Sequence, residues 1–220
     1  TKRGDRNSVL FTIAQIHERQ GHLKLAQDSY KNYLNSGGGD AEKMVEANYK
    51  IAQLNGRRGY HGDADKSYYR TIAVQKSAAH KGRPVGSTWA AEAKFHLTEK
   101  IYDEFTAVRI PANPAKQAQA VKTKLALLTK LSNNLADVIK YDDGNTVIAS
   151  LAKLGQAYDH ISKAIWKAPL PGDLNKEELE TYKKGIDSVA QPLKDKAVEN
   201  YSSAINKSYE INNYSTWTKV

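Results

Sequence analysis

The sequence predicts an all-α fold in which consecutive helices pack in pairs. Ala, Leu, Lys, Glu, Gln and Tyr dominate its 220 residues and Pro occurs only 6 times, a composition that favours helices throughout. Residues 9–34 and 47–72 align with a constant offset of 38, so one helix-pair pattern occurs twice. A related pattern returns in the last third of the chain, at residues 151–158 and 195–205. We therefore expect about four helix pairs.

The internal repeat combines an apolar-small pair, a turn glycine and an A-x-x-x-Y stripe. The matched positions are Ile13-Ala14 with Ile51-Ala52, Gly21 with Gly59, Ala26 with Ala64, Tyr30 with Tyr68, and Leu34 with Ile72. Gly21 and Gly59 stand where the first helix of each pair must end, because glycine enters the left-handed cap without strain. Ala26 and Ala64 are small where the paired helices are expected to cross.

The C-terminal pattern reads L-x-x-L-G-x-x-Y over Leu151–Tyr158. Leu151, Leu154 and Tyr158 fall on one helical face, and Gly155 allows a second helix to approach closely. That second helix is expected at residues 195–205, where Ala197, Tyr201 and Ala204 form its buried stripe.

The segments between these patterns predict further helices. One is expected over residues 88–105 and another over residues 115–141, separated by a loop bounded by Pro111 and Pro114. The apolar stripe of the second is expected at Leu125, Leu128, Leu131, Leu135, Val138 and Ile139. Asn175 and Glu178 form a capping box that begins a helix. Pro192 is expected to break or kink that helix, or to occupy the first turn of the final one.

These patterns resemble the tetratricopeptide repeat, although Leu10 and Asn48 stand where its signature has Trp, and His17 and Asn55 where it has Tyr. The resemblance implies an α-α superhelix of about four helix pairs, the last two extended or interrupted by an insertion. It also implies a single domain over residues 1–220. We expect clear repeats at 7–35 and 45–75, a divergent unit at 87–141, and a split unit at 146–211 with an insertion at 166–192.

A narrower likeness covers residues from about 93 to the end. It rests on Phe95–Leu97, Tyr102–Phe105, Val138–Asp143, Ala168–Pro171, Gln191–Leu193 and Asn213–Thr218. These segments together resemble delta-proteobacterial envelope tetratricopeptide proteins, some of which belong to gliding-motility machinery. The likeness implies a periplasmic or outer-membrane-associated scaffold that recruits other envelope proteins.

Catalytic and metal-binding patterns are not recognisable in the sequence. The chain has no Cys, which excludes disulfides and thiolate metal sites, and its 6 His show no ligand spacing. The segment Gly56–Gly62 is rich in Gly and Arg but lacks a phosphate-binding signature, so we interpret it as a basic turn between helices. We expect no enzyme activity, no cofactor, no metal and no small-molecule substrate.

Charge leaves a second interpretation open. The net charge is +9, and residues 1–80 hold 13 Lys and Arg against 8 Asp and Glu. This basic excess suits an ordinary solvated surface, yet it could also recruit nucleic acid, so a helical-repeat nucleic-acid binder is the alternative. No apolar run approaches the roughly 20 residues of a membrane span. Because the chain begins at Thr1 and its one Met is Met44, we expect a trimmed or mature fragment.

The first helices of stacked repeats line a concave groove, where we expect a protein or peptide segment to bind. Glutamine recurs at the same place in three units, and its amide can both donate to and accept from a peptide backbone. Four residues further on stand two arginines and a histidine, and two aromatic residues would form a floor. An exposed helical face with no binding role accounts for the same residues equally well. The candidate set is Phe11, Gln15, Arg19, Tyr49, Gln53, Arg57, Gln156 and His160.

Overall fold

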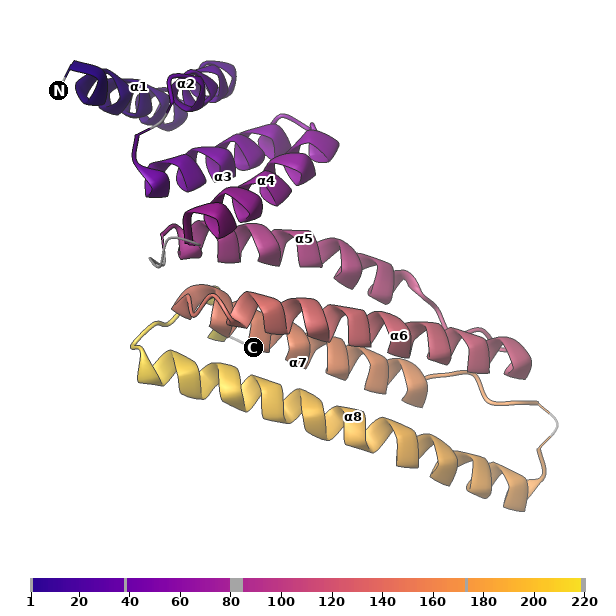
Figure 1. The fold of residues 1–220 in the computed structure, drawn as a ribbon. Helices are drawn as coiled ribbons and strands as arrows, with labels where there is room; N and C mark the ends of the chain where they lie inside the picture. Colours follow the sequence, from indigo (N-terminus) through magenta and orange to yellow (C-terminus); the bar gives the residue numbers. More distant parts are fainter. Residues whose placement is uncertain (1, 38, 80–84, 173, 219–220) are drawn as a thin grey trace. The chain divides into compact units, whose positions relative to one another are not determined.

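Helices form the regular structure of the residues that the structure describes. The computed structural model describes residues 2–37, 39–79, 85–172 and 174–218, and in these ranges there is no strand, which confirms the all-α prediction. Figure 1 shows successive helices running back and forth in pairs. The helices are α1 (Lys2–Arg19), α2 (Leu23–Asn35), α3 (Ala41–Arg57), α4 (His61–Ala79), α5 (Ser87–Ala107), α6 (Pro114–Ile139), α7 (Gly144–Trp166), α8 (Lys176–Glu210) and a 3-10 turn, η1 (Thr216–Thr218).

The chain divides into two compact units, residues 1–97 and residues 98–220. Helices α1 to α4 belong to the first unit, and α6 to α8 with η1 belong to the second. Helix α5 contributes its residues up to Leu97 to the first unit and those from Thr98 onward to the second. The single domain and the repeat boundaries expected from the sequence stay predictions.

In the first unit, α1 pairs with α2, α3 pairs with α4, and α2 packs in addition on α3. Gly21 ends the first pair's leading helix with φ 75° and Gly59 ends the second's with φ 82°. Residues other than glycine rarely adopt a positive φ. The two turn glycines therefore have the role that the repeat predicted. Ala26 and Ala64 are both buried, as expected where paired helices cross.

Aromatic rings fill the first helix pair. Phe11 on α1 meets the ring of Tyr30 edge-on at 5.5 Å and that of Tyr33 at 5.1 Å, both on α2. Ile51 and Leu54 of α3 join the same buried cluster. Helix α2 is therefore held on one side by its own partner and on the other by the next pair.

The second pair continues the arrangement. Tyr49 of α3 and Tyr68 of α4 lie in one buried cluster with Ala93 of α5, and Trp89 of α5 packs against it. Tyr69, the neighbour of Tyr68, is 65% exposed. Consecutive residues of a helix point about 100° apart, so only one of the two tyrosines can face the partner helix.

In the second unit, α7 packs on α6 and on α8. Gly155 of α7 lies against Tyr201 of α8: a Cβ at this position would stand 2.6 Å from a carbon of the Tyr201 ring. The ring of Tyr201 thus occupies the space that a side chain at position 155 would need. This contact confirms the close approach that the L-x-x-L-G-x-x-Y pattern predicted.

Polar side chains cap the helix starts. Asp143 accepts from the backbone N–H of Thr146, so the turn after α6 also starts α7. Asn175 accepts from the backbone N–H of Glu178 while the Glu178 carboxylate accepts from the N–H of Asn175, which confirms the predicted capping box. These bonds satisfy donors that a helix end otherwise leaves free.

Helix α8 runs for 35 residues with Pro192 inside it. The predictions that Pro192 breaks the helix or starts the final one are therefore wrong. Proline in a helix interior costs about 3 kcal/mol through the lost hydrogen bond and ring clash. Ala190 and Ala197, on either side of it, are both fully buried, so packing on α7 continues across the proline and outweighs this cost.

The buried stripe of α6 differs from the prediction at both ends, and at its C-terminal end Ile139 is only half-buried. Leu125 is 37% exposed, whereas Lys124 is only 1% exposed and lies in register with the buried Leu128, Leu131 and Leu135. The Lys124 ammonium donates to the carbonyl of Phe105 at 2.6 Å, in the last turn of α5. A helix C-terminus carries unpaired carbonyls and a partial negative charge, which is why it accepts a buried lysine here.

Among the described helices, none combines the length and the apolar composition needed to cross a membrane.

Replacing Gly155 with alanine is expected to destabilise the fold by about 1–3 kcal/mol, because the new methyl group overlaps the ring of Tyr201 and forces it to move. Gly185→Ala is the matched control. Nothing lies within 4 Å of a Cβ at Gly185, which is an exposed helical position of α8. Alanine there should stabilise by up to about 1 kcal/mol. Urea unfolding of both variants measures the two effects, and equal signs would contradict the close helix contact.

Candidate functional site

A cavity of about 320 Å³ lies in the first unit among α1, α2 and α3. We call it the first-unit cavity. It brings together three of the residues that the sequence analysis nominated: Gln15 and Arg19 from α1 and Arg57 from the end of α3. Its other walls were not predicted, and they are formed by Glu18, Tyr30, Glu46 and Lys50.

Glu18 organises one wall of the first-unit cavity. Its carboxylate accepts a hydrogen bond of 2.8 Å from the Tyr30 hydroxyl and one of 3.1 Å from the Lys50 ammonium. Burial, together with the bond to Glu18, raises the pKa of Tyr30 far above its usual range. Tyr30 therefore stays a neutral donor, and the three side chains tie α1, α2 and α3 together beneath the opening.

Glu46 lies on the same cavity without such partners. No hydrogen bond or ion pair is formed by its side chain within the described ranges. Burial raises the pKa of Glu46; the Lys50 ammonium opposes this effect, and the nearby Glu18 carboxylate adds to it. The cavity thus holds an incompletely compensated carboxylate, the kind of group that gains most from an incoming cation or N–H donor.

Arg19 and Arg57 supply the opposite charge. Both are exposed, and neither takes part in an ion pair among the residues that the structure describes. Gln15 is half-buried beside them. The cavity therefore offers guanidinium donors, a side-chain amide and an acceptor carboxylate within one hollow.

Three other nominated residues lie elsewhere. Phe11 and Tyr49 are buried in the helix-pair cores, so neither forms the open aromatic floor that we expected. The Tyr49 hydroxyl donates to Glu92 and accepts a 3.0 Å bond from Gln53. The Gln53 side chain is therefore already hydrogen-bonded within the protein, and it does not line the first-unit cavity.

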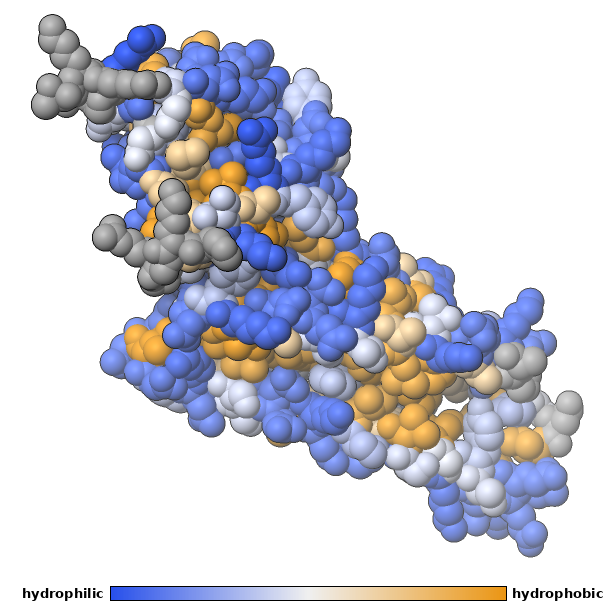
Figure 2. All heavy atoms as spheres, viewed as in Figure 1, coloured by the Kyte–Doolittle hydropathy of each residue, from blue (hydrophilic) through white to orange (hydrophobic). Residues whose placement is uncertain are grey.

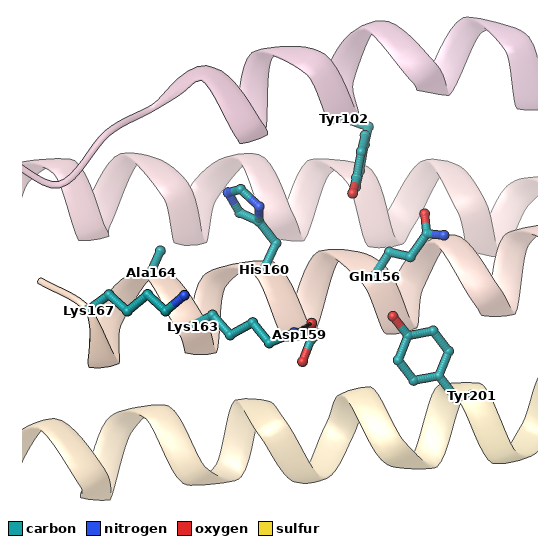
Figure 3. Close-up of a pocket in the computed structure, with 8 residues that line it drawn as sticks. All are labelled: Tyr102, Gln156, Asp159, His160, Lys163, Ala164, Lys167 and Tyr201. Carbon is teal, nitrogen blue, oxygen red and sulfur yellow. Dashed lines mark ion pairs between the residues drawn. The ribbon is translucent and has the colours of Figure 1, made fainter. Parts of the chain in front are cut away.

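A second cavity, of about 460 Å³, lies in the second unit among α5, α7 and α8. Figure 3 shows Tyr102 pointing down from α5 and Tyr201 pointing up from α8, on either side of the α7 residues. Two nominated residues, Gln156 and His160, line it. Sequence reasoning missed the rest of the lining: Tyr102, Asp159, Lys163, Ala164, Lys167 and Tyr201.

His160, which lines the second cavity, lies against the buried Lys124. Its Nε2 lies 3.2 Å from the Lys124 ammonium, and its ring centre lies 5.3 Å from that of Phe105. Burial and the neighbouring ammonium lower the pKa of His160, while Asp159 opposes them, and burial likewise lowers the pKa of Lys124. A neutral imidazole that accepts from Lys124 fits this geometry, which gives His160 a structural partner.

Asp159 links α7 to α8 at the edge of the second cavity. It forms ion pairs of 2.6 Å with Lys163 on α7 and with Lys194 on α8. Burial acts to raise its pKa, but the two ammonium groups outweigh burial and lower it. Asp159 is therefore already paired with two lysines, one of which, Lys163, also lines the cavity.

A third cavity, of about 420 Å³, lies between α6, the end of α7 and the first half of α8. Figure 2 shows hydrophobic side chains gathered in this region between α6 and α8. Val121, Ile165 and Ile186 line it, and Tyr182 donates to Gln117 across it at 3.0 Å. Its walls are apolar and its few polar groups are already paired.

Within the described ranges, no cluster of three or more His, Asp and Glu side chains could hold a metal ion. The expectation of no metal and no cofactor stays a prediction.

Glu46→Gln should make the protein more stable near neutral pH than the wild type. The pKa of Glu46 is raised in the fold, so its contribution to stability is present below its unfolded pKa and is lost as pH rises through the folded value. Glutamine cannot ionise and escapes this loss. Melting temperatures should therefore differ more at about pH 7 than at about pH 4. The exposed Glu199→Gln variant is the control. If its melting temperature departs from that of the wild type by the same pH-dependent amount, the burial of Glu46 is not the cause of the effect.

Neither a comparison with models of protein families nor one with curated proteins finds a match for this chain. The tetratricopeptide resemblance and the likeness to envelope proteins therefore stay predictions from the sequence.

Proposed function

We propose that the chain is a non-catalytic scaffold that binds a segment of a partner protein in the first-unit cavity. The observation that carries this proposal is the convergence of Gln15, Arg19 and Arg57 on one hollow with Glu46, whose carboxylate has no ion-pair partner among the described residues. Groups of both charge signs and an amide suit a peptide, which offers backbone N–H and carbonyl groups beside charged side chains.

The same chemistry argues against the alternative of nucleic-acid binding at this place. A phosphate backbone would meet the carboxylates of Glu18 and Glu46 as well as the two arginines. Phe11 and Tyr49, the aromatic residues nominated for the groove, are buried and so offer no ring on which a base could stack. Nucleic-acid binding therefore finds its support only in the net charge of +9.

The proposed ligand follows from the lining. A carboxylate of the peptide would pair with Arg19 and Arg57, whose guanidinium groups favour bidentate contact. A lysine or arginine of the peptide would pair with Glu46, and a backbone amide with Gln15. We propose, in line with the resemblance described above, that the partner belongs to a bacterial envelope assembly.

Selection from a displayed random-peptide library against the full chain tests the proposal. Enriched peptides should carry acidic and basic residues close together. Arg19→Ala/Arg57→Ala should weaken their binding at least about tenfold, because each charge-assisted bond is worth roughly 1.5–3 kcal/mol. The Glu46→Gln variant should bind peptides that carry the basic residue more weakly, and it should bind peptides without that residue as the wild type does.

The control is the double variant Arg6→Ala/Arg70→Ala, which removes the same charge from exposed positions outside the cavity. Equal losses in both double variants would reduce the effect to net charge and overturn the site. Binding to a single-stranded RNA at about 50 mM salt that disappears by about 200 mM, with no peptide enriched, would favour the nucleic-acid alternative.

A further inference from the structure

An apolar strip on α1 lies open to solvent. Val9, Ile13 and Ile16 fall on one helical face and are 56%, 38% and 46% exposed. The repeat offset of 38 matches them with Ala47, Ile51 and Leu54 of α3, which are 0%, 7% and 1% exposed. The face that is buried on α3 is therefore open to solvent at the equivalent positions of α1.

The structure shows what covers this face on α3. Ile51 and Leu54 lie in one hydrophobic cluster with Tyr30 of α2, and Leu34 of α2 packs against that cluster. The covering surface is the outer side of the second helix of the preceding pair. The open face of α1 is therefore shaped for a second-type helix that carries the A-x-x-x-Y stripe.

Helix α8 is such a helix, and its outer side is also uncovered. Aligning Ala26 and Tyr30 with Ala197 and Tyr201 places Val198 at the position of Gln27 and Ile205 at that of Leu34. Gln27 is 4% exposed against α3, whereas Val198 is 53% and Ile205 is 39% exposed.

The C-terminal turn does not cover this side of α8. Trp217 of η1 packs against the cluster of Ile148, Ala152 and Ala204. Val198, Ile205 and, one turn further, the 63% exposed Tyr209 remain in contact with water.

We propose that α8 of one molecule packs on α1 of a second molecule, as α2 packs on α3 within the chain, so that copies associate head to tail. One chain carries both halves of this interface, and the packing of α2 on α3 provides the template for it. Both faces are apolar, and the burial of such faces is what drives one helix of a repeat to pack on the next. The two faces differ from each other, so the contact is heterologous and can continue from copy to copy.

The template also sets the register. Leu34 of α2 packs against the cluster that contains Ile51 of α3, and the equivalents of these two residues are Ile205 on α8 and Ile13 on α1. Ile13 of one molecule should therefore lie next to Ile205 of its neighbour. A single helix face buries a small area, so we expect a weak contact, with a dissociation constant on the order of 100 µM.

Sedimentation across about 10 µM to 1 mM tests the assembly, and the mean mass should at least double over this range. Ile16→Glu on α1 and Val198→Glu on α8 should each abolish the rise, because each buries an unpaired charge in the contact. An equimolar mixture of the two variants should form dimers and nothing larger, since each retains one intact face. The exposed Tyr69→Glu on α4 is the control and should assemble as the wild type does.

Crosslinking tests the register in a chain that has no native Cys. Ile13→Cys and Ile205→Cys molecules, once mixed, should be joined by a short bis-maleimide, while either variant alone should not. Tyr69→Cys replaces Ile13→Cys as the control and should give no product with Ile205→Cys. A wild type that stays monomeric throughout, a mixture of the glutamate variants that does not dimerise, or efficient crosslinking of one cysteine variant with itself would overturn the head-to-tail contact.

Discussion

The interlock of a small residue with a tyrosine between paired helices is the contact on which the rest of the structure depends. Tyr30 of α2 is fully buried in one cluster with Ala14 of α1, and the ring of Tyr201 of α8 fills the space above Gly155 of α7. A larger residue at either small position would push the helices apart, because protein interiors leave no spare volume for it. The close approach in turn sets how the outer faces of the helices are presented to the next pair.

Each helix pair formed in this way leaves one apolar side that the pair cannot cover itself. Between α2 and α3 that side is closed within the chain, through Tyr30, Leu34 and Leu54. At α1 and α8 the equivalent positions remain open. One packing rule therefore accounts both for the cohesion of the first unit and for the two faces at which we propose that molecules associate. Burial of apolar area drives both, at roughly 25 cal/mol per Å².

The sequence predicted the helices, their turn glycines and the capping box well, because each of these follows from local chemistry. It predicted Leu125 in the core and overlooked Lys124, because the two partners of this lysine, the Phe105 carbonyl and the His160 ring, lie 19 and 36 residues away in the sequence. The prediction for Pro192 failed for a related reason. The helix continues because residues on both sides of the proline are buried, and this packing outweighs the local cost of a proline in a helix. In the first-unit cavity, Gln15 and Arg19 were accessible to reasoning from repeat spacing. Glu18 and Lys50 were not, because these two paired residues lie 32 positions apart in the sequence, on helices α1 and α3.

The first-unit cavity has a composition that stability alone does not explain. Glu18 is satisfied by Tyr30 and Lys50, so a core built for stability would be complete with these three residues. Glu46 adds a second carboxylate close enough to raise its own pKa further, and Arg19 and Arg57 stand near it without a described ion pair. Such an arrangement lowers the stability of the free protein, and a ligand that supplies the missing charges recovers the difference as binding energy. The raised pKa of Glu46 and the selectivity that we propose for the first-unit cavity therefore have the same cause, the incompletely compensated charges that line it.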